Sequence, residues 1–102
     1  PDQKVFSSDF LAIDIRRFEN SDYDAYQEWI GYAVNEYVTS DLIYEHESGT
    51  TYYYSGYNGS VIVYGKIALK NSVLYSAVIY YNQDVKEEMD KLIPKMLRNF
   101  PN

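Results

Sequence analysis

The first part of the chain alternates apolar and polar side chains with a period of two, which is typical of a strand with one buried face. Between residues 10 and 18, Leu11, Ile13 and Ile15 lie on one side of such a strand, and smaller or charged side chains lie on the other. We therefore predict a first strand over residues 10–18.

The same period returns after residue 41 and continues to residue 82. Glycine, asparagine and serine interrupt it at short intervals. The Asn58-Gly59 pair suits a type I′ hairpin turn, because both central positions of that turn need positive φ. The pattern predicts a four-stranded antiparallel meander, in which Lys66 and Lys70 mark the more solvent-exposed side of the third strand. Its strands are predicted at about 41–47, 50–56, 60–70 and 73–82.

Two other segments have apolar side chains three and four residues apart, which is the period of an amphipathic helix. The first helix is predicted over about residues 22–38. Ser21 and Asp24 form a capping-box-like pair at its start, and further acidic residues follow near its positive end. Its apolar stripe is expected to pack against the sheet.

The second helix is predicted to begin at Asp84, with Glu87 three residues later as the partner in another capping box. Apolar positions then recur at helical spacing to residue 100. Because proline has no N–H to donate to the preceding turn, Pro94 is expected to bend this helix or to divide it into two pieces.

This order of elements predicts an α+β fold: a strand, a helix, a four-stranded antiparallel meander and a second helix, with both helices packed on the sheet. A chain of 102 residues has room for one hydrophobic core, so we expect a single domain over residues 1–102.

The layout over about residues 9–100 resembles the PsbP-like α+β sandwich family. Two strands rich in aliphatic and tyrosine residues lead into a helix that ends in residues 96–100, Met-Leu-Arg-Asn-Phe, similar to the Leu-x-x-Phe-type finish of that family. Its members usually begin with a further apolar strand or hairpin. Only residues 1–8 could supply this element here, and we expect it to be missing.

Tyrosine is unusually frequent, with 13 residues against four phenylalanines and one tryptophan. Nine of the tyrosines lie in the predicted meander, where β-propensity and cross-strand pairing account for most of them. Those near the Gly56–Gly59 turn are candidates for a protein contact, because tyrosine offers a large area and a hydroxyl at a low cost in entropy. The candidate binding residues are Tyr52, Tyr53, Tyr54 and Tyr57, whose neighbours must face opposite sides of the sheet.

The charges are distributed unevenly along the chain. The whole chain has 15 acidic against nine basic residues, a net charge of −6, which argues against a nucleic-acid partner. Between residues 18 and 64 there are eight acidic residues and no lysine or arginine. Glu28, Glu45 and Glu47 are therefore candidates for a negative surface that attracts a basic partner. Helix capping and simple solvation are the alternative explanation.

No catalytic residue, metal site or cofactor is expected. The chain has no cysteine, which excludes thiolate nucleophiles, disulfides and Cys-ligated metals. The single histidine, His46, is predicted to face away from its neighbours Glu45 and Glu47 on a strand, and a metal site would need two further ligands. We interpret His46 as a surface or edge-strand residue. A small enzyme that positions its substrate with tyrosine hydroxyls is a less favoured alternative.

No apolar run approaches the roughly 20 residues that span a bilayer, so no membrane span is expected. The sequence begins with Pro1 and not with Met, which indicates a processed or trimmed product. As a separate expectation, an exported or cell-surface location is slightly favoured over a cytoplasmic one. We expect a non-enzymatic, PsbP-like accessory domain, exported or lipid-anchored, that binds another protein through a tyrosine-rich sheet face or edge. The alternative is an intracellular acidic partner, immunity-type or secretion-chaperone-like, that neutralises a basic client through residues 18–64.

Overall fold

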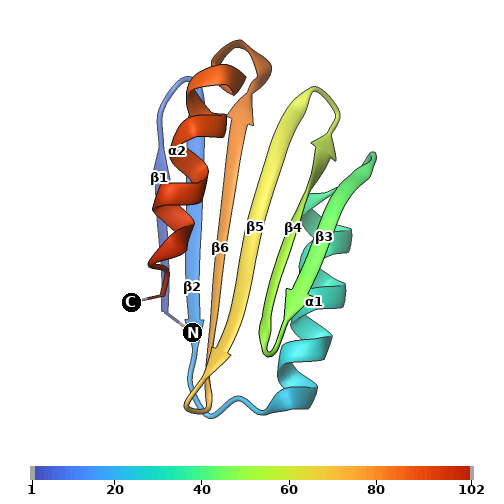
Figure 1. Cartoon of the computed structure of the whole chain (residues 1–102), viewed down its shortest axis with the longest axis vertical. Coiled ribbons are helices and arrows are strands. Elements are labelled where there is room, and N and C mark those ends of the chain that lie inside the picture. The colour runs from blue at the N-terminus through green and yellow to red at the C-terminus, as the bar shows by residue number, and fades with distance from the viewer. Residues whose placement is uncertain (1, 102) are drawn as a thin grey trace.

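Six strands form one antiparallel sheet in the computed structural model, which describes residues 2–101 (Figure 1). The strand order across the sheet is β1-β2-β6-β5-β4-β3, so the chain crosses from the second strand to the far edge through the first helix. The elements are β1 Asp2–Ser7, β2 Leu11–Phe18, α1 Tyr23–Tyr37, β3 Leu42–Ser48, β4 Thr51–Asn58, β5 Val61–Lys70, β6 Val73–Asn82, a 3₁₀ turn Gln83–Val85 and α2 Lys86–Arg98.

The α+β class, the antiparallel meander and the two helices are confirmed, with element boundaries within about two residues of the predicted ones. The expectation that no strand precedes residue 10 is wrong. Residues Asp2–Ser7 form β1, which pairs antiparallel with β2 along its whole length. All of its residues are exposed, so backbone hydrogen bonds hold this edge strand, and a burial pattern could not reveal it.

The helix ends also differ from the predicted capping. Asp22 caps α1 by accepting a hydrogen bond from the backbone N–H of Ala25 at 2.9 Å, while the Ser21 hydroxyl donates to the Phe18 carbonyl. At the second helix, a side-chain oxygen of Asn82 accepts from the backbone N–H of Asp84 and begins the 3₁₀ turn. The cap of α1 is therefore one residue after the predicted Ser21, and the cap of the 3₁₀ turn is two residues before the predicted Asp84.

Pro94 does not divide the second helix, because α2 continues from Lys86 to Arg98 with Pro94 inside it. The buried side chains Met89, Ile93 and Leu97 recur on one side of α2, before and after the proline. Their packing against the sheet keeps the helical course despite one missing backbone hydrogen bond.

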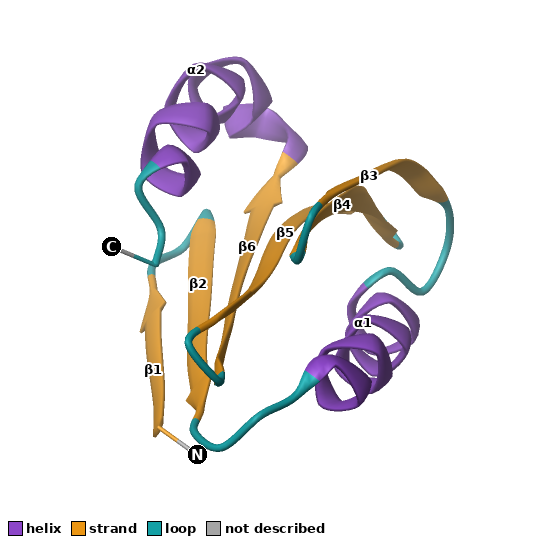
Figure 2. Ribbon diagram, turned by 60° about the horizontal axis from the view of Figure 1, so that its bottom comes forward, coloured by secondary structure: helices purple, strands orange, loops and turns teal. Residues whose placement is uncertain are grey.

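The two helices lie on opposite faces of the sheet (Figure 2). On the α1 face, the core is built around Tyr26, Tyr54, Val63, Ile67 and Val78. On the α2 face, a second core joins Ile62, Ile79, Tyr81, Ile93 and Leu97. Because side chains alternate along each strand, β5 and β6 contribute to both cores, which is why their sequences are almost continuously apolar.

Each helix covers only part of its face. α1 contacts β4 and β5, whereas α2 contacts β6, and Figure 1 shows α2 in front of the β1–β2–β6 side with α1 behind β3 and β4. Within the described residues, the part of the α2 face formed by β3 and β4 is therefore not covered by a helix, whereas Ile62 and Lys66 of β5 are buried beneath α2. The uncovered part carries the candidate site.

Lys66 is not on a solvent-exposed side, contrary to the prediction, because only 5% of it is accessible. Its ammonium group donates to the backbone carbonyls of Leu97 at 2.6 Å and Phe100 at 2.7 Å. Carbonyl groups at the C-terminal end of a helix have no partner within the helix and carry partial negative charge. Lys66 satisfies them and joins the end of α2 to the middle of the sheet.

Candidate protein-binding surfaces

A groove lies between α2 and strands β3–β5 on the α2 face. It consists of two cavities that share Tyr64, one of about 280 Å³ and one of about 180 Å³. The larger is lined by tyrosines, by His46 and by the last turns of α2, and the smaller by Ile43, Ile62 and the first turns of α2. We call this feature the tyrosine groove and define it by Tyr44, His46, Tyr53, Tyr57, Tyr64 and Arg98.

Strand register brings the polar and aromatic side chains of the groove together. Tyr44 pairs with Ser55 and His46 with Tyr53 across β3 and β4, and Tyr53 pairs with Lys66 across β4 and β5. Directly paired residues point to the same face of an antiparallel sheet, so all of them face α2. The register between β3 and β4 shifts next to Tyr44, at Ile43, which is 64% exposed at the rim.

In the larger cavity, the Tyr53 ring contacts both the His46 ring and the Lys66 ammonium group. The His46 ring stacks on Tyr53 with centroids 6.4 Å apart, and the Lys66 ammonium lies 5.3 Å from the centre of the same Tyr53 ring. Burial lowers the pKa of Lys66, and the two carbonyls of the α2 end hold its ammonium in place. Tyr53 is thereby fixed between a cation and an aromatic ring.

The two ends of the groove differ in charge. At the start of α2, Lys86 and Asp90 form an ion pair at 2.5 Å, and the Tyr81 hydroxyl lies 3.4 Å from the same carboxylate. Burial, with Asp90 nearby, raises the pKa of Tyr81 to about 12, so this hydroxyl remains protonated. At the other end the lining includes Arg98 and His46 and no carboxylate.

Two of the four candidate tyrosines lie inside the protein. Tyr54 is fully buried and Tyr52 is 8% exposed, and both belong to the core under α1, with their rings stacked 5.9 Å apart. Tyr53 and Tyr57 project to the α2 face, where they line the two cavities. The alternation of β4 therefore sorts the candidates into two core residues and two groove residues.

The candidate acids lie on the α1 side of the sheet. Glu47 accepts a hydrogen bond from the Tyr26 hydroxyl and Glu45 one from the Tyr52 hydroxyl, each at 2.7 Å. Burial, together with these hydrogen bonds, raises the pKa of both tyrosines. His46 lies on the opposite face, so the predicted separation of this histidine from its two glutamates is confirmed.

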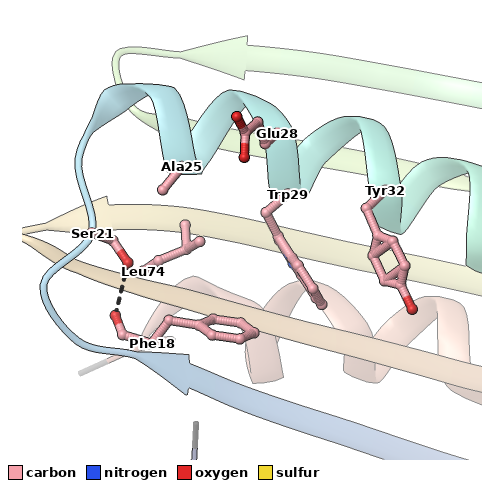
Figure 3. A pocket seen from close by; sticks show the side chains of 7 residues that line it. All are labelled: Phe18, Ser21, Ala25, Glu28, Trp29, Tyr32 and Leu74. Carbon is pink, nitrogen blue, oxygen red and sulfur yellow. Dashed lines mark hydrogen bonds between the residues drawn. The ribbon is translucent and has the colours of Figure 1, made fainter.

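Glu28 does not join the other two acids but borders a separate aromatic cavity of about 280 Å³ beside α1 (Figure 3). Trp29 lies 4.8 Å from Phe18 and 5.0 Å from Tyr32 between ring centroids. The Arg16 guanidinium already lies 5.5 Å from the centre of the Trp29 ring. In Figure 3, Glu28 points away from Phe18, and most of the other residues that line the cavity are apolar or aromatic.

Sequence reasoning missed the contributions of Tyr44, Tyr64 and Arg98 to the groove. Counting in steps of two from Tyr53 and crossing each hairpin would have placed Tyr44 and Tyr64 on its face. Arg98 gave no such signal, because its position depends on how α2 packs across the sheet.

The described residues contain no group of three or more His, Asp or Glu side chains arranged to hold a metal ion. Neither helix within residues 2–101 is both long enough and apolar enough to cross a membrane. Comparisons of the chain with protein-family models, with curated proteins and with solved structures found no match.

Proposed function

We propose that this chain is a non-enzymatic accessory domain that binds another protein through the tyrosine groove. The observation that carries this proposal is the part of the sheet on the α2 face over which no helix lies within residues 2–101, and which tyrosine side chains line. Tyr53, Tyr57 and Tyr64 are half-buried there, so they are held by the sheet and still offer surface to a partner.

The rim of the groove supports the same function. Ile43 and Tyr44 are 64% and 45% exposed at the edge strand β3. Large apolar side chains that gather on one surface, bordered by polar groups, are typical of protein-interaction sites. Concave shape and aromatic lining are also typical of the centres of such interfaces.

The PsbP-like resemblance belongs to this proposal. Members of that family usually begin with a further apolar strand or hairpin before the strand that leads to the first helix, and β1 supplies one strand in this place, although its residues are exposed. The element order and the two-sided helix packing are compatible with an α+β sandwich of this kind. With this resemblance we also propose that the protein is exported or attached to a cell surface.

Replacement of Tyr53 or Tyr57 by alanine is expected to weaken partner binding by about 5- to 30-fold each, the effect of losing 1–2 kcal/mol at an aromatic anchor. A photo-crosslinking residue at Ile43 would first identify the partner in lysate of the source cells. Titration calorimetry with the purified pair would then measure the affinities.

Tyr23→Ala is the matched control, because Tyr23 is 53% exposed on α1, on the other face of the sheet. It should leave the affinity unchanged. Wild-type affinity in folded Tyr53→Ala and Tyr57→Ala proteins would contradict the proposal.

A second candidate function is supported by the distribution of acids. Glu45 and Glu47 project to the α1 side, and Glu28 and Glu36 are exposed on α1 itself, with no lysine or arginine between residues 18 and 64. This arrangement favours the acidic partner protein that neutralises a basic client.

If the α1 side binds a basic client, Glu28→Lys combined with Glu45→Gln and Glu47→Gln should slow association at least tenfold at low salt. The glutamines keep an acceptor for the two tyrosine hydroxyls. The difference should shrink in about 0.5 M salt, because screening shortens the range of the field. Stopped-flow measurements would give the rates. Glu87→Lys with Glu88→Lys, on the first turn of α2, changes charge elsewhere and should have a much smaller effect.

A further inference from the structure

Resting on the proposed function, we infer that the segment bound in the tyrosine groove carries an acidic side chain, which Arg98 receives at the C-terminal end of α2. The larger cavity has the cationic Arg98 and the imidazole of His46 in its lining and no carboxylate. A guanidinium offers paired donors that fit a carboxylate, and aromatic walls reduce the competition from water.

The fold removes nearby negative charge from this end of the groove. Glu45 and Glu47 flank His46 in sequence, but strand alternation directs both to the opposite face, where tyrosine hydroxyls bind them. Asp90 lies near the other end of α2 and is neutralised by Lys86. An acid would therefore meet the positive potential of Arg98 without repulsion from a lining residue.

Lys66 removes a further source of repulsion. The C-terminal end of a helix carries roughly half a negative charge, which would disfavour an anion beside the last turn of α2. The ammonium of Lys66, on β5, donates hydrogen bonds to the Leu97 and Phe100 carbonyls and lies against the Tyr53 ring. The local field at the larger cavity is thus set by cations.

The smaller cavity indicates which kind of partner side chain lies next to the acid. It meets the larger cavity at Tyr64 and is lined partly by Ile43, Tyr57 and Ile62, while its only acid, Asp90, is already paired. An apolar side chain fits this chemistry. The inferred ligand is therefore an extended partner segment with an Asp or Glu near an aliphatic or aromatic residue, and the apolar residue lies toward the start of α2.

The test uses a random seven-residue peptide library displayed on phage and selected on the whole protein. Selected sequences are expected to be enriched in an acid next to an apolar residue and to be lost on Tyr53→Ala. One selected peptide would then be synthesised with a C-terminal amide, so that a chain terminus cannot supply the carboxylate. Its Glu→Gln or Asp→Asn form should bind at least tenfold more weakly.

Arg98→Glu should lower the affinity for the acidic peptide at least tenfold, whereas Lys95→Glu should change this affinity less than twofold. Lys95 is the matched control, because it is an exposed cation on the same turn of α2 and does not line the groove. Thermal unfolding of both variants shows whether the fold is intact, and Arg98→Gln provides a milder second variant.

The outcomes separate the two proposals. The inference would be overturned if a peptide that depends on Tyr53 binds equally well after its acid is replaced. It would also be overturned if such a peptide binds Arg98→Glu and Arg98→Gln as well as the wild type. In both cases the groove would remain the binding surface. If selection yields no peptide that depends on Tyr53, the groove is not the binding surface and the proposed function fails. Selected peptides rich in Lys or Arg that bind the α1 side would favour the acidic-partner alternative.

Discussion

Raising the pH above about 10 is expected to unfold the protein abruptly, because at least four tyrosine hydroxyls are buried in it. Tyr26, Tyr52, Tyr54 and Tyr81 are each no more than 8% exposed. Burial raises the pKa of all four hydroxyls above the ordinary value, to about 12 for Tyr81 and further for the others. The folded protein therefore keeps protons that the unfolded chain releases near about pH 10.

Above that pH the unfolded state binds fewer protons, so the free energy of unfolding falls as the pH rises. Each such hydroxyl lowers it by at most about 1.4 kcal/mol per pH unit, and four together by about 4 kcal/mol between about pH 10 and 11, where the unfolded tyrosines are still only partly ionised. This loss approaches the roughly 5–15 kcal/mol that stabilises a typical domain. Below about pH 10 these groups leave stability independent of pH.

Circular dichroism and tyrosinate absorbance, recorded along one alkaline titration, would test this expectation. The circular dichroism and the absorbance change of the buried tyrosines should occur together, over the same narrow range of pH. Tyr54→Phe is an informative variant, because the Tyr54 hydroxyl is buried without a hydrogen-bond partner among the described residues. This substitution should remove the contribution of one hydroxyl to the fall of the unfolding free energy above about pH 10, with little loss of stability near neutral pH. Gradual ionisation of all tyrosines with unchanged circular dichroism would refute the argument.

Gly65→Ala is expected to destabilise the protein by about 3 kcal/mol through overpacking. A methyl group on Gly65 would lie 2.1–2.5 Å from the ring and hydroxyl of Tyr54. That ring is fully buried and stacks on Tyr52, so it has no space to move away. The glycine of β5 thus makes room for a core tyrosine of β4, directly opposite it in the sheet.

Urea denaturation would measure this effect. Gly31→Ala is the control, because Gly31 is exposed on α1 and an added methyl group meets nothing within 4 Å. It should stabilise the protein by about 0.5–1 kcal/mol through helix propensity. In a Tyr54→Leu background, Gly65→Ala should cost much less than in the wild type. An equal cost in both backgrounds would show that the contact with Tyr54 is not the cause.

The elements with a strong local pattern could be predicted from the sequence. The meander, α1 and α2 all have an apolar period that matches their structure, and a tight turn joins β4 to β5 as expected. The type I′ turn predicted over Asn58-Gly59 is wrong, because Asn58 still pairs with Val61 and only Gly59, the first of the two loop residues, has positive φ. β1 could not be predicted, because its side chains are exposed on both faces and its stability depends on pairing with β2. Lys66 was misplaced for a related reason, since its partners are carbonyls 31 and 34 residues away.

The candidate site was predictable only in part. Alternation within β4 shows that Tyr53 and Tyr57 share a face that Tyr52 and Tyr54 do not, but it cannot show on which face a helix covers β4. That depends on where α1 and α2 cross the sheet, which is decided by packing between distant residues. The contribution of Arg98 follows from the same packing.

The placement of the helices on opposite faces has a consequence for assembly. The tyrosine groove and the acidic α1 side lie back to back across one sheet, so a molecule bound on one side would not touch a molecule bound on the other. Binding free energies at separated sites of this kind add without coupling. A chain that used both sides would connect an acidic segment of one protein to a basic surface of another, and would raise the effective concentration of each for the other.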